Sequence, residues 1–124
     1  MSNYANKKGK VGELELAKWM EKVSGVHYRR VPMSGALHQD FPFDVMKIGS
    51  QDSVFDGIGN ENKNTKQLAV KDWINQSEVA ADDASVRDWF IRFALHGTNK
   101  NYFILPESYF EKLILAKKRL NEIE

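Results

Sequence analysis

Two acidic residues and one lysine in the middle of the chain have a spacing that suits phosphate chemistry. The sequence predicts strands over 41–48 and 56–63, and folding this hairpin symmetrically about its centre places Asp44 opposite Glu61. Directly opposed residues share a face of the sheet, with Cβ atoms about 5 Å apart. Lys63 lies two residues after Glu61 and therefore on the same face. Two carboxylates and one ammonium are thus expected to converge on one point.

Opposed carboxylates of this kind destabilise a sheet unless a cation lies between them. Magnesium takes oxygen ligands at about 2.1 Å and is often held by one or two carboxylates together with water and a substrate phosphate. A metal held by Asp44 and Glu61 would lower the pKa of a bound water and offset charge on a phosphoryl oxygen. Lys63 would then steer the water or stabilise the transition state. An ordinary salt bridge between Lys63 and either acid is the alternative, which the spacing leaves open.

A third carboxylate is expected from the first predicted helix, residues 8–23. At about 100° per residue, an apolar stripe defines the buried face of this helix: Leu16, Ala17, Trp19, Met20 and Val23. Glu13 projects into the same face, whereas Glu15 and Lys18 fall on the opposite side. An inward carboxylate needs a partner, because an unpaired buried charge is too costly to keep. A functional site, a salt bridge and a helix-end effect all remain open as the reason for its orientation.

Length and composition frame these motifs. The chain has 124 residues, 42% hydrophobic and 28% charged, and is expected to form one globular domain over residues 1–124. It contains no cysteine, which excludes thiol catalysis, zinc ribbons and iron-sulfur clusters. No apolar run approaches the roughly 20 residues of a membrane span, and we expect a cytoplasmic protein with no membrane partner. Lys and Arg number 18 against 17 Asp and Glu, so a net charge of +1 does not by itself indicate a nucleic-acid binder.

The remaining elements follow from the periodicity of the sequence. A strand is expected over 26–31, and apolar positions recur at helical spacing over 67–81. Aromatic-rich runs at 89–95 and 102–105 predict a second hairpin, and Pro106 suits the first turn of a last helix. The order is helix, three strands, helix, two strands, helix. The expected fold class is therefore α/β, with a central mixed five-stranded sheet flanked by helices.

The order of the motifs resembles that of a known nuclease superfamily. The segments that carry this resemblance hold a helix-opening acid, an arginine-bearing strand, a Ser-Gly sequence, an aspartate motif and a Glu-x-Lys motif. The matching segments here are Lys8-Gly9-Lys10-Val11-Gly12-Glu13-Leu14-Glu15, Arg29-Arg30-Val31-Pro32, Ser34-Gly35-Ala36, Pro42-Phe43-Asp44, Glu61-Asn62-Lys63 and Leu105-Pro106-Glu107. Over nearly its whole length the chain resembles the PD-(D/E)XK nucleases, and more narrowly the archaeal and phage type of Holliday-junction resolvase. The resemblance implies a restriction-endonuclease-like core, of order αβββαββα, and metal-dependent hydrolysis of DNA phosphodiesters.

The resemblance also implies roles for single residues. Asp44 and Glu61 correspond to the metal ligands of the family. Glu13 corresponds to the acid of the first helix, which would complete the metal shell or hold a bound water. Lys63 corresponds to the lysine of the Glu-x-Lys motif. Ser34 matches the serine of the Ser-Gly loop, which lies near the scissile phosphate in the resolvases. The implied cofactor is Mg²⁺, with Mn²⁺ as a substitute.

The chain departs from the family pattern at two places. Phe43 separates the family's proline from Asp44. Asp40 and Asp56 are therefore alternative ligands, although the parity of its strand puts Asp56 on the face opposite the acid pair. The middle residue of the Glu-x-Lys motif is usually apolar and here is Asn62.

Basic and polar residues that flank the acidic motifs are candidates for phosphate contacts, with a solvated charged face as the alternative. These candidates are Lys8, Lys10, Arg29, Arg30, Ser34 and Lys66. Gly9 and Gly12 weaken a helix start but allow close backbone approach to another molecule. Gln76, at the edge of the apolar face of the second predicted helix, is a candidate polar support for Lys63 or for substrate.

Together these features predict a magnesium-dependent endonuclease acting on branched DNA, most simply on four-way junctions. A junction offers two symmetry-related strands, and the resemblance implies a homodimer. The expected location is the cytoplasm, that of the host if the protein is phage-encoded. Two alternatives remain open: a restriction- or repair-type nuclease acting on duplex, flap or single-stranded DNA, and a catalytically silent DNA-binding module of the same fold.

Overall fold

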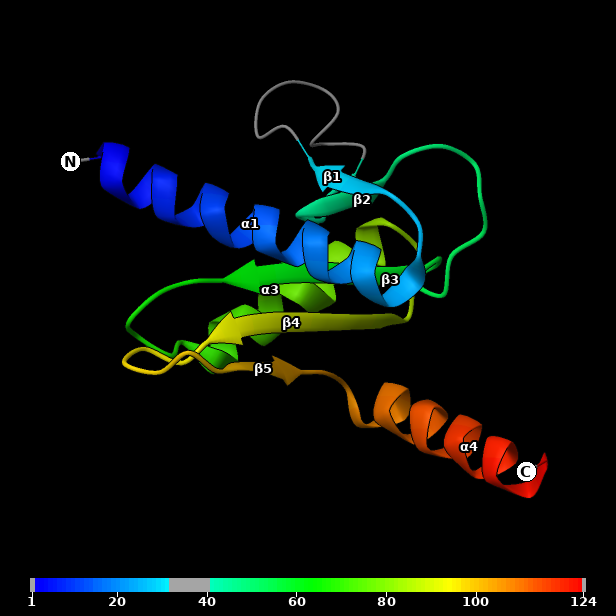
Figure 1. The fold of residues 1–124 in the computed structure, drawn as a ribbon. Helices are drawn as coiled ribbons and strands as arrows, with labels where there is room; N and C mark the ends of the chain where they lie inside the picture. The colour runs from blue at the N-terminus through cyan, green and yellow to red at the C-terminus, as the bar shows by residue number, and fades with distance from the viewer. Residues whose placement is uncertain (1, 32–40, 124) are drawn as a thin grey trace.

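Helices cover the two faces of the strands, and the chain follows the predicted order of elements (Figure 1). The computed structural model describes residues 2–31 and 41–123, with side chains in the first helix described from residue 9 onward. The elements are α1 (Ser2–Ser24), β1 (Tyr28–Arg30), β2 (Val45–Lys47), β3 (Ile58–Lys63), α3 (Val70–Asp83), β4 (Asp88–Ala94), β5 (Asn101–Ile104) and α4 (Glu107–Ile123). The α/β class expected from periodicity is confirmed.

The strands form two sheets, so the expectation of one five-stranded sheet is wrong. β1 and β2 pair antiparallel, while β3, β4 and β5 form a second sheet in which β3 and β4 are parallel and β5 is antiparallel to β4. β2 and β3 meet through a side chain instead of a ladder. Asn60 Oδ1 accepts a hydrogen bond from the Val45 N–H at 2.8 Å, and Asn60 Nδ2 donates to the Val45 carbonyl at 2.8 Å. Beside the amide, the backbone N–H of Asp44 donates to the Asn60 carbonyl at 3.4 Å, but β2 and β3 do not pair as neighbours in one sheet.

The contact between Val45 and Asn60 nevertheless keeps the register expected for the hairpin. In that register the residue before Val45 faces the residue after Asn60, which are the two acids of interest. Close packing beside this contact requires a glycine in β3, because a Cβ at Gly59 would lie 2.6 Å from Cε1 of the Phe43 ring. The sequence therefore fixes which residues face each other, while Asn60 and Phe43 decide how the two strands are held.

The parallel pairing of β3 and β4 depends on α3, which makes the crossover that parallel neighbours need. Figure 1 shows α1 in front of β3 and α3 behind it. Each helix covers its own apolar cluster. The α1 side contains Leu16, Ala17, Met20, Val26, Tyr28, Val45, Phe90 and Tyr109, and the α3 side contains Trp73, Ala81, Trp89 and Ile91.

The last turn of α1 departs from the predicted burial, and α4 is largely exposed. Val23, in the last turn of α1, is exposed. α4 leads away from the body of the molecule (Figure 1), so Tyr109 near its start is buried while Phe110, Leu113 and Ile114 are exposed. Among the described residues, no helix has the length and apolar character needed to cross a membrane.

Candidate active site

Asp44 and Glu61 meet where the two sheets join. Asp44 directly precedes β2, and Glu61 lies in β3. Oδ2 of Asp44 accepts a hydrogen bond from the backbone N–H of Asn62 at 2.7 Å, which fixes the Asp44 carboxyl against β3. The carboxyl groups of Asp44 and Glu61 lie close enough for each to affect the pKa of the other. The structure therefore brings together the two acids that the strand register predicts to be opposed.

The surroundings of this acid pair disfavour two negative charges. Burial raises the pKa of Asp44 from its ordinary 3.8 to about 8, and the nearby charges of Glu61 and Glu13 add to this effect. The hydrogen bond from Asn62 and the charge of Lys63 act in the opposite direction. Burial also raises the pKa of Glu61, against the effect of Lys63. Because both carboxyls cannot readily ionise together, the pair retains a proton near neutral pH.

Lys63 lies beside the acid pair and is held from two sides. Its Nζ donates a hydrogen bond to Oε1 of Gln76 in α3 at 2.9 Å, and lies 3.6 Å from Oε2 of Glu61. The Lys63 side chain is 19% exposed, which leaves the ammonium reachable but not free in solvent. Gln76 thus makes the supporting contact that its place on the predicted helix suggests.

Glu13 points inward, as helical periodicity predicts, with a side chain that is 13% exposed. Its partner is Arg30, whose Nε donates to Oε1 of Glu13 at 2.9 Å. The salt bridge that the sequence left open as an explanation for this orientation is therefore present. The charge of Glu13 still reaches the acid pair, because it raises the pKa of both Asp44 and Glu61.

The donor chemistry of the acid pair fits a divalent cation. Two carboxylates are a common protein contribution to a Mg²⁺ site, with water and substrate phosphate as the other ligands. A cation would replace the shared proton and remove the repulsion between Asp44 and Glu61. Within residues 2–31 and 41–123, no three or more His, Cys, Asp or Glu side chains are grouped to hold a metal ion. Glu13 is bound to Arg30, so the protein ligands that fit are the two strand acids.

Comparisons with known proteins find no match for the chain. No protein-family model, curated protein or solved structure matches it.

A basic groove of about 440 Å³ lies between α1 and β1, next to the pair of Glu13 and Arg30. Four cations line this groove, together with the acid Glu21: Lys10, Lys18, Arg29 and Arg30. Three of them are candidates from the sequence, and the structure brings these three together. Helical periodicity places Lys18 on the solvent side of α1 and so does not predict it as a groove residue. Periodicity cannot show that β1 packs along that side of the helix.

The remaining candidates for phosphate contacts are not gathered in this groove. Lys66 is exposed in the connection between β3 and α3 and is not among the residues that line the groove. Lys8 belongs to α1, but its side chain is not described. Ser34 and the alternative metal ligand Asp40 lie outside the described residues.

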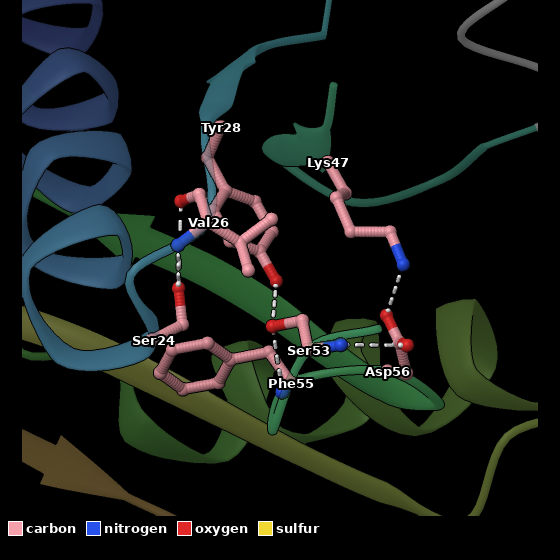
Figure 2. Close-up of polar contacts among 7 residues, drawn as sticks. All are labelled: Ser24, Val26, Tyr28, Lys47, Ser53, Phe55 and Asp56. Atoms are coloured by element: carbon pink, nitrogen blue, oxygen red, sulfur yellow. Dashed lines mark hydrogen bonds and ion pairs between the residues drawn. The ribbon is translucent and has the colours of Figure 1, made fainter. Parts of the chain in front are cut away.

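Asp56, the other alternative ligand, is engaged by Lys47 and Ser53, as Figure 2 shows. Its Oδ1 accepts a hydrogen bond from Lys47 Nζ at 2.8 Å, and its Oδ2 accepts one from the Ser53 N–H at 3.0 Å. The contact with Lys47 lowers the pKa of Asp56. Asp56 lines a cleft of about 490 Å³ whose lining includes neither acid of the pair. The parity of the predicted strand correctly excludes it from their face.

Two asparagines of β3 position the acids, and sequence reasoning gave neither a functional role. Asn60 ties β3 to β2 beside Asp44, and Asn62 donates its backbone N–H to Asp44. Asparagine is depleted in strands, so two of them flanking Glu61 are a signal in the sequence that side-chain contacts are needed there.

Proposed function

We propose that the protein is a metal-dependent endonuclease that hydrolyses phosphodiester bonds of DNA, with Asp44 and Glu61 as its metal ligands. The observation that carries this proposal is a buried carboxyl pair, with the pKa of both acids raised, beside the ammonium of Lys63. Such a pair is costly without a cation and becomes favourable with one. The order of elements agrees with the resemblance to the PD-(D/E)XK nucleases, and a restriction-endonuclease-like core is part of the proposal.

Each side chain near the pair has a defined task in this proposal. Asp44 and Glu61 would hold Mg²⁺, or Mn²⁺ in its place, which when bound would supply Lewis-acid stabilisation of the phosphoryl oxygen and activate water. Lys63, held by Gln76, orients the attacking water and offsets charge that develops on the phosphoryl oxygen. Glu13 adds negative potential at the pair, and its bond to Arg30 keeps it turned inward.

The basic groove supports DNA as the substrate. Lys10, Lys18 and Arg29 are exposed on its walls, where they can hold backbone phosphates. Arg30 lines the groove and also donates a hydrogen bond to Glu13, the α1 residue whose charge acts on the acid pair. The chain carries a net charge of only +1, so binding depends on this local concentration of cations. We place four-way junctions first among DNA substrates and a homodimer as the acting unit, on the resemblance to the resolvases and the two-fold symmetry of a junction.

The test is incubation with a labelled four-way junction and with linear duplex of the same sequence, each in magnesium, in calcium and in chelator. We expect cutting of the junction in magnesium and none in chelator. Glu61→Gln should lose cutting and keep DNA binding, because the amide cannot serve as an anionic ligand. Asp56→Asn is the matched control and should cut at the wild-type rate, since Asp56 contacts Lys47 and Ser53 instead.

The possible outcomes separate the alternatives. Equal cutting of junction and duplex removes the junction preference and favours a restriction- or repair-type nuclease. Binding without cutting, unchanged by Asp44→Asn and by magnesium, overturns the proposal in favour of a silent DNA-binding module. Sedimentation of the free protein tests the homodimer, and a monomer at the concentrations that support cutting contradicts that part.

A further inference from the structure

The side chain of Asn62 fills the space between α1 and β3 at Gly12. A Cβ built on Gly12 would lie 2.4 Å from Nδ2 and 3.5 Å from Cγ of Asn62. No real Cβ comes so close to another heavy atom, so either the helix or the amide would have to move. The close approach that Gly12 permits is therefore an approach to this chain's own β3.

Arg92 holds the Asn62 amide from the other side. The two residues are register partners in the parallel pair of β3 and β4, and Nη1 of Arg92 donates to Oδ1 of Asn62 at 3.4 Å. Arg92 is 9% exposed, and burial lowers the pKa of its guanidinium. Among the described residues no carboxylate lies within ion-pair distance of Arg92, which leaves the Asn62 oxygen as its described acceptor. Rotation of the amide away from Gly12 would cost this bond.

Asn62 therefore contacts both Asp44 and the helix that carries Glu13. Its backbone N–H holds Asp44, and its side chain sets how closely α1 approaches β3, one residue before Glu13. We propose that Asn62 is a positioning residue, which fixes the place of Glu13 relative to the acid pair, with Gly12 as the matching position on the helix. This inference rests on the proposed nuclease function and deepens it.

The experiment compares two glycine variants of the same helix. Gly12→Ala puts a methyl group into the space of the Asn62 amide, whereas a Cβ on Gly9 meets nothing within 4 Å. Both substitutions raise helix propensity equally, so Gly9→Ala is the matched control. Gly12→Ala/Asn62→Ala removes the amide and leaves room for the new methyl group, and is the rescue variant.

We expect Gly12→Ala to cut about 100-fold more slowly at saturating DNA, the loss typical of a misplacement of about 1 Å at a catalytic centre. The magnesium concentration for half-maximal cutting should rise, because Glu13 is then displaced relative to Asp44 and Glu61. The rescue variant should regain only part of the rate, because it removes the clash but also the Asn62 amide that sets the distance of the helix and accepts from Arg92. Gly9→Ala should match the wild type. A thermal scan should show a lower midpoint for Gly12→Ala and a raised one for Gly9→Ala.

Three results would overturn the inference. If the Gly12→Ala variant cuts DNA as fast as the Gly9→Ala variant, the acids do not depend on Asn62. If its thermal midpoint falls while its rate and magnesium requirement stay unchanged, the contact is purely structural. Rescue that fails to raise the rate above that of Gly12→Ala shows that the amide is not the obstacle. A wild-type chain that cuts no DNA in any metal overturns the proposed function instead, and the opposite midpoint shifts of the two glycine variants then still report the contact itself.

Discussion

Asn60 and Val45 exchange two hydrogen bonds, in which one side-chain amide satisfies both the N–H and the carbonyl of a residue in the neighbouring strand. The Asn60 amide takes the place of a peptide group of β3 as donor and acceptor. It lies at the point where Asp44 leads into β2. The two sheets are thereby joined beside a backbone hydrogen bond, in which the Asp44 N–H donates to the Asn60 carbonyl at 3.4 Å. The acid pair lies directly beside this joint.

Loss of the Asn60 amide should destabilise the protein strongly. Asn60→Ala leaves the buried N–H and carbonyl of Val45 without partners, at a cost of about 1–3 kcal/mol for each unsatisfied group. Asn60→Asp should also destabilise, because a carboxylate cannot donate to the Val45 carbonyl. Urea unfolding measures both, with the exposed Asn99→Ala as control, expected within about 0.5 kcal/mol of the wild type. An Asn60→Ala chain as stable as this control would contradict the role given to the amide.

Stability in chelator should fall as pH rises from about 4 to about 8. The raised pKa of Asp44 means that the folded chain binds more protons than the unfolded chain between 3.8 and about 8, so deprotonation in this window disfavours folding. Magnesium should stabilise more at the upper end of the window, where no proton competes for the pair.

Urea unfolding across this pH range, with and without magnesium, provides the measurement. Asp44→Asn should flatten the fall in stability, because the amide does not titrate. Asp56→Asn should leave the fall intact, since the lowered pKa of Asp56 makes it act in the opposite direction and at lower pH. A wild-type slope equal to that of Asp44→Asn would show that the carboxyl is ionised throughout.

Gln76→Ala should slow DNA cutting by about tenfold through kcat, with little effect on DNA affinity, because Lys63 then loses the acceptor that holds its ammonium. Gln76→Glu should retain much of the rate, since it keeps an acceptor oxygen within reach. The neighbouring Asn75, which is exposed on the same helix, provides the matched control as Asn75→Ala. An effect confined to KM would mean that Gln76 contacts substrate and does not act through Lys63.

Lys18→Ala and Arg29→Ala should each weaken DNA binding and lower its salt dependence. Each phosphate contact that is lost should reduce the slope of log K against log salt by about 0.9. Titration of the four-way junction over a range of salt concentrations measures this slope. Lys22→Ala is the control, because Lys22 is exposed on the same helix but does not line the groove. Equal slopes for all three variants would exclude the groove as the DNA-binding surface.

Much of the site could be predicted because it depends on positions within single elements. The alternation of a strand places Glu61 and Lys63 on one face, and helical periodicity turns Glu13 inward. The expected hairpin register also brought Asp44 to Glu61, although the strands form no ladder. What could not be predicted is Arg30 as the partner of Glu13, because α1 and β1 meet only through packing.

By itself, the sequence determined the order of helices and strands and the face on which each acid lies, because both follow from backbone geometry repeated every 2 or 3.6 residues. Only the tertiary structure decided that two sheets form where one was expected, that Asn60 joins them and that Asn62 separates α1 from β3. These contacts depend on the shape and hydrogen-bonding groups of side chains distant in sequence. No local period carries that information, since each partner is chosen only when the elements pack.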